Sequence, residues 1–221
     1  LKIEGESIIQ RTYNKALEAL KDKKKIIIAT DSSEIEAHCK TFNARTIMTS
    51  KSCLTGTDRI AEVAEIIPSK QYINLQGDEP AIEIDDIKSL NDKMVKNNSN
   101  LGTLAAKIKD NKNLKNENIV KVITENNLES DHFPKAVSFS RKSEQVENIY
   151  HHVGIYCYSR DCLEKFVHLD QSKNEIENRL EQLRALDNNI DINVSLAMSS
   201  PIGVDTEEDY LALKKIMEYK N

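Results

Sequence analysis

Short apolar runs alternate with segments of helical spacing along the whole chain. The run at 25–30 is typical of a strand that is covered on both faces, and 71–75 is a second predicted strand. In 8–20 and 85–95, apolar residues recur every three or four positions, which predicts helices. Such alternation favours an α/β fold with a mainly parallel central sheet.

The same patterns predict the remaining elements. We interpret 109–118, which is rich in Lys and Asn, as a linker between two strands. Further strands are expected at 45–49, 101–108, 119–124, 136–139, 150–158 and 190–197, and further helices at 31–42, 57–68, 174–186 and 206–218.

Composition narrows the class of protein. The chain has 221 residues, 39% of them hydrophobic and 30% charged, which predicts a soluble globular protein. A net charge of −5 argues against a nucleic-acid partner, and no apolar stretch has the length of a membrane span. The basic run at 21–25 is interpreted as a solvated loop. Four cysteines without a C-x-x-C pair predict free thiols in the cytoplasm and no zinc site.

One polar segment directly follows the strand predicted at 71–75. It is Gln76-Gly77-Asp78-Glu79-Pro80, and open α/β sheets bind ligands at the carboxyl ends of their strands. Gly77 permits close backbone approach, and the Asp78 carboxylate could hold Mg²⁺ beside phosphates. An ordinary turn is the alternative, because Gly, Asp and Pro are all turn residues.

Two further segments combine helix-start signals with candidate ligands. Gly203-Val204-Asp205-Thr206 opens the last predicted helix, so Asp205 is either an N-cap or a second Mg²⁺ carboxylate. Thr55-Gly56-Thr57-Asp58-Arg59 opens another helix, where a Gly-containing turn and Arg59 could bind an anion. A plain capped helix would explain that second segment equally well.

Strand parity and helix position mark two more groups. In 150–158, His152, Gly154, Tyr156 and Tyr158 share the polar face, while the other face is mostly apolar. That polar face suits a polar ligand, although His152 could also be a structural histidine. Glu181 and Gln182 flank the core-facing apolar stripe of Ile176, Leu180 and Leu183 in the helix predicted at 174–186. They could contact sugar hydroxyls, or Glu181 could pair with neighbours such as Arg184.

Taken in order, these segments resemble the 3-deoxy-manno-octulosonate cytidylyltransferases, or CMP-KDO synthetases. The matches span essentially the whole chain: Ser7-Ile8-Ile9-Gln10-Arg11, Ile28-Ala29-Thr30-Asp31, Thr55-Gly56-Thr57-Asp58-Arg59, Asn74-Leu75-Gln76-Gly77-Asp78-Glu79-Pro80, Val120-Lys121-Val122, Phe139-Ser140-Arg141, His152-Val153-Gly154-Ile155-Tyr156, Leu180-Glu181-Gln182-Leu183-Arg184 and Gly203-Val204-Asp205-Thr206.

The resemblance implies a Rossmann-like nucleotidyltransferase fold with a small inserted β-rich region for dimerisation and sugar binding. It implies a homodimer that joins CTP to 3-deoxy-D-manno-octulosonate (KDO) with Mg²⁺, giving CMP-KDO and pyrophosphate for lipopolysaccharide synthesis. Asp78 and Asp205 would be the Mg²⁺ ligands, and these two with Arg59 would form the catalytic set. Substrate contacts are expected from Gln76, Arg141, His152, Tyr156, Glu181 and Gln182.

The family begins with a strand and a phosphate-gripping loop, and this sequence starts just after them, at Leu1. We therefore expect the 221 residues alone to be inactive. We interpret 1–221 as one domain, with a nucleotide part at 1–100, a sugar and dimerisation part at 101–200 and a closing helix at 201–221. The alternatives are a cytidylyltransferase for amino-KDO or a sialic acid, and a non-catalytic dimerising remnant.

Overall fold

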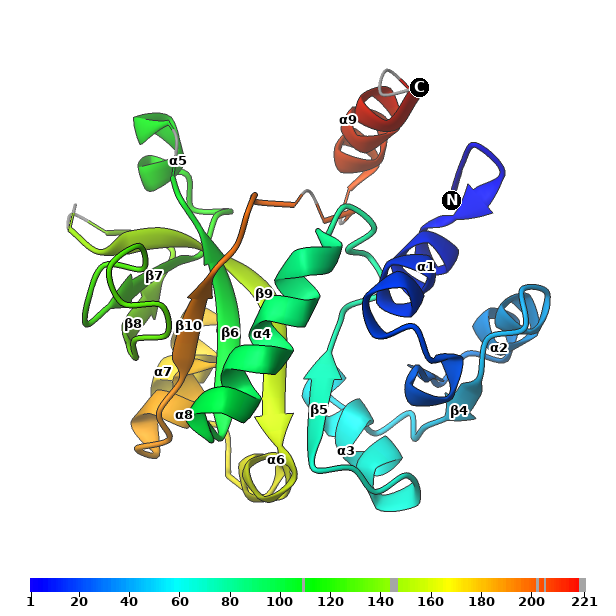
Figure 1. Ribbon diagram of the computed structural model, residues 1–221, viewed down its shortest axis with the longest axis horizontal. Helices are drawn as coiled ribbons and strands as arrows, with labels where there is room; N and C mark the ends of the chain where they lie inside the picture. The colour runs from blue at the N-terminus through cyan, green and yellow to red at the C-terminus, as the bar shows by residue number, and fades with distance from the viewer. Residues whose placement is uncertain (109, 144–146, 202, 205, 219–221) are drawn as a thin grey trace. The chain divides into compact units, whose positions relative to one another are not determined.

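The computed structural model describes residues 1–108, 110–143, 147–201, 203–204 and 206–218, and the chain is traced in Figure 1. The chain divides into two compact units. Unit 1 comprises 1–67, 75–88 and 201–221, and unit 2 comprises 68–74 and 89–200.

Unit 1 holds a short parallel strand pair with helices around it. Strand β3 pairs in parallel with β4, and β1 pairs with β2 in a small hairpin. Its elements are β1 (Lys2–Ile3), β2 (Glu6–Ser7), α1 (Ile8–Leu20), η1 (Lys23–Lys25), β3 (Ile28–Thr30), α2 (Ser33–Lys40), β4 (Thr46–Met48), α3 (Gly56–Ile66) and α9 (Glu207–Glu218).

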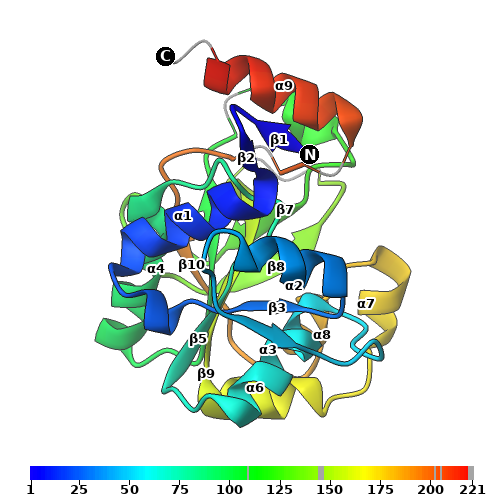
Figure 2. The ribbon, with the colours of Figure 1, turned by 90° about the vertical axis from the view of Figure 1, so that its right-hand side faces the viewer.

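The core of unit 1 lies where α1 and α2 cover the strand pair (Figure 2). Tyr13, Ile26, Cys39 and Ala44 are buried there, and the apolar side of α1 packs against them. The helix starts are fixed by side-chain caps, since the Ser7 hydroxyl accepts the amide of Gln10. The 3.6-residue periodicity read from 8–20 is therefore confirmed.

Unit 2 contains the larger sheet. Helix α4 begins in unit 1 and continues into unit 2, and α6 follows β9 directly. The elements are β5 (Gln71–Asn74), α4 (Ile84–Asn97), β6 (Leu101–Ala106), α5 (Asn111–Lys115), β7 (Lys121–Thr124), β8 (Ala136–Ser140), β9 (Ile149–Ser159), α6 (Arg160–Val167), α7 (Lys173–Asn178), α8 (Leu183–Asp187) and β10 (Asn193–Leu196).

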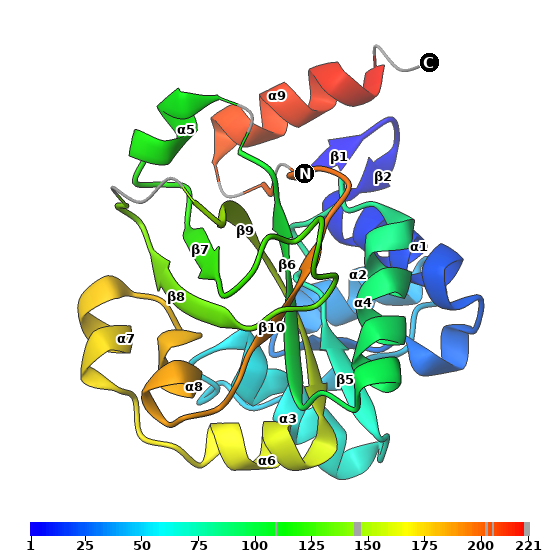
Figure 3. The same cartoon turned by 60° about the vertical axis from the view of Figure 1, so that its left-hand side comes forward.

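Strand β9 lies inside this sheet and bonds antiparallel neighbours along both edges. One edge pairs with β6, and the other pairs with β7 and then with β5. The order is β10-β6-β9-β7-β8, with β10 parallel to β6 and α7 and α8 beside β8 (Figure 3). The α/β fold is confirmed, and the larger sheet is mixed: the expected parallel pairing occurs there in β6–β10 and also in the separate β3–β4 pair.

One sequence-based element prediction was wrong. The helix expected at 174–186 is broken, because Arg179 adopts the left-handed conformation (φ 54°) and ends α7 before α8 begins. Ile176, expected to face the core, is 60% exposed, whereas Leu180 and Leu183 are buried. The expected linker between strands β6 and β7 is confirmed, and it contains the short helix α5. No helix in the described part of the chain is long and apolar enough to cross a membrane.

Gly102 in β6 tests how tightly α4 packs on the sheet. A Cβ added there would lie 2.7 Å from Met94 Sδ and 3.0 Å from Phe133 Cζ, and both side chains are buried. We expect Gly102→Ala to lower the free energy of unfolding by about 1–3 kcal/mol, measured by urea denaturation. The control is Gly154→Ala in β9, whose added Cβ meets nothing within 4 Å. Equal stability of the two variants would contradict this packing.

Candidate active site

The Gln76–Pro80 segment is held in place through backbone atoms. The hydroxyl of Thr12, a buried residue of α1, donates to the carbonyl of Gly77 at 3.0 Å. The amide of Glu79 donates to the carbonyl of Gln76 at 3.2 Å. The segment is therefore more than an open turn, because a helix far back in the sequence fixes its conformation.

A distant part of the chain meets the same segment. The amide of Val204 donates to the carbonyl of Asp78 at 3.0 Å, and a Cβ on Gly203 would lie 3.2 Å from Glu79 Oε1. Asp205 itself lies outside the described residues. The expected convergence of Asp78 with Asp205 stays a prediction, and the contact of the preceding residue with Asp78 supports it.

Arg59 reaches the carboxyl ends of the parallel strand pair. Its guanidinium donates to Thr49 Oγ1 at 2.5 Å and to Asp31 Oδ2 at 3.3 Å, and these residues directly follow β4 and β3. The start of the same helix is closed by a capping box between Thr55 and Asp58. Capping therefore accounts for Asp58, whereas Arg59 places a cation at the edge where α/β sheets bind ligands.

Gln76 lies against the first residue of α3. A Cβ on Gly56 would come within 2.9 Å of Gln76 Nε2, so only glycine permits this approach without displacing the amide. Unit 1 therefore gathers a helix N-terminus, an arginine and an amide around the ends of β3 and β4. Backbone amides at a helix start and a guanidinium favour a negatively charged ligand.

In unit 2, a row of rings follows one face of β9. His152 lies 5.5 Å from Tyr156, and Tyr156 lies 6.1 Å from Tyr158, measured between ring centroids. The row continues to Phe139 at one end and Phe166 at the other. Strand parity predicted that His152, Tyr156 and Tyr158 would share a face. The structure confirms this, although the pairing of β9 with β6 shifts register between Thr103 and Leu104.

His152 is a neutral, buried imidazole. The hydroxyl of Thr103 donates to the carbonyl of Ile155 at 2.8 Å, so its oxygen accepts from His152 Nε2 at 3.0 Å. This tautomer makes Nδ1 the hydrogen-bond acceptor of the ring. Burial, with a smaller contribution from the charge of His151, lowers the pKa of His152 to about 3. Burial also raises the pKa of Tyr156 well above its usual value, so its phenol stays protonated.

Glu181 and Gln182 lie in the turn between α7 and α8. The turn follows left-handed Arg179 and is closed by the amide of Arg184, which donates to the carbonyl of Glu181 at 3.0 Å. The charge of Glu181 contributes to the raised pKa of Tyr156, so this turn lies near the ring row. Unit 2 therefore combines a neutral imidazole, a phenol, a carboxylate and a buried amide, which suits a ligand with several hydroxyl groups.

A sequence model described as cytidylyltransferase matches residues 1–192. The chain belongs to the cytidylyltransferase family. A 3-deoxy-manno-octulosonate cytidylyltransferase of Thermodesulfovibrio yellowstonii is 36% identical over 97% of this chain and 89% of its own length. The enzyme of that name in Haemophilus influenzae (strain Rd) is also 36% identical, over 97% of this chain and 90% of its own.

Solved structures give the same family. A CMP:2-keto-3-deoxy-manno-octonic acid synthetase in complex with CTP superposes with a TM-score of 0.89 and 30% identity, covering 100% of this chain and 91% of its own. A UDP-glucose pyrophosphorylase in complex with UDP-glucose superposes with a TM-score of 0.68 at 15% identity, which shows the fold alone. The predicted resemblance to the CMP-KDO synthetases is thus confirmed.

Lys121 is a residue of this cytidylyltransferase whose role sequence reasoning missed. It is 1% exposed, and its ammonium donates to the carbonyls of Asn116 and Arg141 at 2.5 and 2.7 Å. Arg141 in turn donates to the carbonyl of Glu117. Burial lowers the pKa of Lys121, and the charge of Arg141 adds to this effect. The only sign of this role in the sequence was a lysine that is flanked by valines within a predicted strand.

The described residues contain no group of three or more His, Cys, Asp or Glu side chains arranged to hold a metal ion. Mg²⁺ in nucleotidyl transfer is commonly held by one or two carboxylates together with substrate phosphates. A pair of carboxylates from the 78 and 205 positions of this cytidylyltransferase would therefore be sufficient, and the contact between Val204 and Asp78 fits such a pair.

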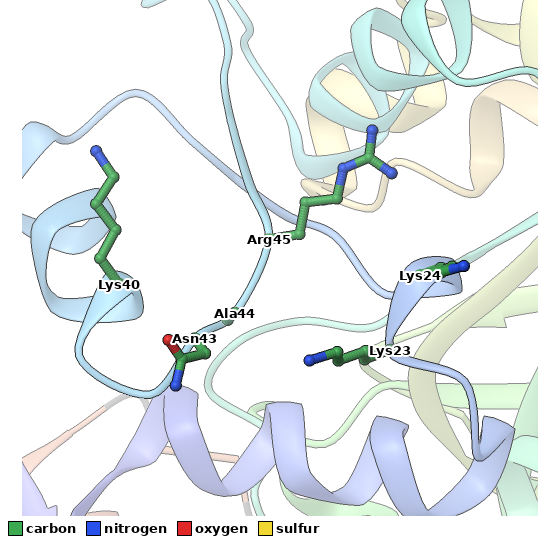
Figure 4. A pocket seen from close by; sticks show the side chains of 6 residues that line it. All are labelled: Lys23, Lys24, Lys40, Asn43, Ala44 and Arg45. Carbon is green, nitrogen blue, oxygen red and sulfur yellow. The ribbon is translucent and has the colours of Figure 1, made fainter.

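A basic pocket occupies the other end of the β3–β4 pair (Figure 4). Lys23 and Lys24 precede β3, and Arg45 directly precedes β4, so the pocket lies at the amino ends of the strands. Its lining residues are Lys23, Lys24, Lys40, Asn43, Ala44 and Arg45. We do not assign this pocket to the chemistry, because the site described above follows the carboxyl ends. The solvated lysine loop expected here is the exposed helix η1.

The low pKa of His152 predicts a dependence of stability on pH. The pKa is about 3 in the folded protein and about 6.5 in an unfolded chain, so between these values the unfolded state binds the extra proton. Acidification from pH 6.5 towards 3 should therefore lower the free energy of unfolding, by up to about 1.4 kcal/mol per pH unit for this one group. His152→Gln, measured by urea denaturation at several pH values, should lack this component. If the free energy of unfolding changes with pH in the same way in both proteins, the low pKa assigned to His152 is refuted.

Proposed function

We propose that this protein transfers the cytidylyl group of CTP to KDO, giving CMP-KDO and pyrophosphate for lipopolysaccharide synthesis. The observation that carries the proposal is similarity over nearly the whole chain to proteins that bear this activity in their names. The likeness to a synthetase solved with CTP supports the nucleotide half of the reaction. The chemistry is attack of the anomeric hydroxyl of KDO on the α-phosphorus, with pyrophosphate as the leaving group.

We assign nucleotide binding to unit 1. Gln76 and the start of α3 would contact CTP, and Arg59 would move from Asp31 to the phosphates. A guanidinium there offsets negative charge that develops on the α-phosphate in the transition state. The Asp31 carboxylate is 38% exposed, so the loss of its ion pair with Arg59 should cost little free energy.

Sugar binding is assigned to unit 2. His152 Nδ1 can accept a hydroxyl hydrogen of the sugar, while the neutral phenol of Tyr156 can donate one. Glu181 and Gln182 offer further acceptors and donors to the remaining hydroxyls. Arg141 suits the KDO carboxylate, because a guanidinium binds a carboxylate with two parallel hydrogen bonds.

Asp78 and Asp205 would hold the Mg²⁺ ion. When bound, Mg²⁺ would neutralise phosphate charge and orient the triphosphate. Asp78 fits this role because backbone atoms fix its segment against Val204. A homodimer in the cytoplasm completes the proposal. Four free cysteines agree with a reducing compartment, and the dimer rests on the family resemblance.

The proposed reaction is tested by incubating the full-length protein with CTP, KDO and Mg²⁺ and measuring pyrophosphate release. Mass spectrometry of the product should show CMP-KDO. Parallel reactions with amino-KDO and with a sialic acid identify the sugar, and we expect the largest kcat/KM for KDO. A larger value for either competitor would replace KDO as the substrate. No turnover of any of the three would support the non-catalytic alternative.

Asp78→Asn tests the metal assignment. The substitution keeps the size of the side chain and removes its charge, so Mg²⁺-dependent pyrophosphate release should fall by about a hundredfold or more. The unfolding temperature should fall little, because the hydrogen bonds of Thr12 and Val204 to the backbone of this segment are kept in the variant. The control is Asp85→Asn, since that carboxylate is 74% exposed and pairs with Lys88 on the surface of α4. Activity of Asp78→Asn equal to that of the control would exclude Asp78 as a ligand.

A further inference from the structure

A buried ion pair joins the two short helices on either side of the Glu181–Gln182 turn. Arg184 of α8 donates to both carboxylate oxygens of Glu175 in α7, from Nε at 2.8 Å and from Nη2 at 2.6 Å. Both side chains are only 5% exposed. Such a pair is unusual in a protein of this size, because removing two charges from water is costly unless every polar atom finds a partner.

The carboxylate of Glu175 has further partners just before the start of α7. It accepts the amide of Ser172 and the side-chain amide of Gln171, each at 3.2 Å, so it also completes the capping box of its own helix. Burial alone would raise the pKa of Glu175, but the hydrogen bonds from Arg184 and Gln171 outweigh it and the pKa is lowered. Glu175 therefore stays charged and rigidly oriented, which fixes where the guanidinium must lie.

The backbone between the paired residues is short and strained. Arg179 is left-handed, a conformation that costs about 1 kcal/mol for a residue other than glycine. The amides of Leu180 and Arg184 then donate to the carbonyls of Glu175 and Glu181. The ion pair bridges the ends of this turn, and the turn carries the two side chains assigned to the sugar.

The guanidinium of Arg184 also contacts the ring row. Its Cζ lies 4.7 Å above the ring of Phe166, which is 5.8 Å from Tyr158. Tyr158 is in turn next to Tyr156. One buried side chain is therefore linked to both groups of candidate sugar contacts: it belongs to the 179–184 turn, and it contacts Phe166, which leads to Tyr156 through the tilted ring of Tyr158.

We propose that Glu175 and Arg184 are positioning residues for the sugar acid, which act by holding the 179–184 turn in register with the ring row. This inference rests on the proposed function. Arginine is required because lysine cannot make the two parallel bonds and stack on Phe166 at the same time. Small displacements of positioning groups strongly reduce recognition of an oriented substrate, so the loss should appear for the sugar acid and not for CTP.

The test compares KM values for KDO and for CTP in three variants. Arg184→Lys keeps the positive charge but loses the planar guanidinium that makes two parallel hydrogen bonds to Glu175. Glu175→Gln leaves a buried guanidinium without its carboxylate, and it could fail to fold. The double variant Glu175→Gln/Arg184→Met removes both charges, keeps an acceptor for the Ser172 amide and fills the volume of the arginine stem, so it should fold. The unfolding temperature is measured for each, and kinetics are recorded well below it.

We expect the KM for KDO to rise about tenfold or more in Arg184→Lys and in the double variant, with the KM for CTP changed less than about twofold. The matched control is Glu164→Gln, which breaks the exposed Arg160–Glu164 pair on α6 and should change neither constant. Lower unfolding temperatures with both KM values unchanged would show that the pair is structural only and would overturn the proposal. Equal rises in both constants would overturn it too. A wild-type protein that does not use KDO would instead refute the proposed function.

Discussion

Strand β9 sets the geometry on which the rest of unit 2 depends. It pairs with β6 along one edge and with β7 and β5 along the other. Hydrogen bonds to three strands therefore fix the rotation of β9 about its own axis. Once that rotation is fixed, the two-residue period of a strand determines which side chains share a face. His152, Tyr156 and Tyr158 must then lie together, and a one-residue slip would replace them with the alternate, mostly apolar set.

This dependence explains which features could be predicted from the sequence. Face assignment along β9 and the capped start of α3 are local properties, set by backbone periodicity and by hydroxyl or carboxylate groups near a helix start. Their prediction therefore succeeded. The antiparallel ladders on β9 depend on partners far away in the chain, and apolar patterns do not distinguish them from parallel ones. The break at Arg179 was missed for a related reason: no glycine marks it, and contacts outside the turn impose it.

In the candidate site, too, local features could be predicted from the sequence, whereas contacts with distant residues could not. Carboxylates after a strand and an arginine after a helix cap carry local signals, so Asp78 and Arg59 could be proposed from sequence. The hydroxyl partners Thr12 and Thr49 could not, because they look ordinary in the sequence. Lys121 is a clearer case. A lysine between valines suggests an exposed alternate position, yet it is fully buried against two carbonyls.

Unit 2 buries two cationic side chains, and their charges are stabilised in different ways. Lys121 spreads its charge over neutral carbonyls, and burial depresses its pKa, whereas Arg184 meets a carboxylate that remains charged. Neither arrangement is the cheapest way to fill a core, since apolar residues of similar volume would avoid the cost of desolvation. Each instead fixes a segment that strand pairing does not reach: the Arg141 backbone in one case and the Glu181–Gln182 turn in the other. Both segments carry residues assigned to binding of the sugar acid. Burial of these charges is unfavourable for stability, but it orients segments whose position matters for the reaction.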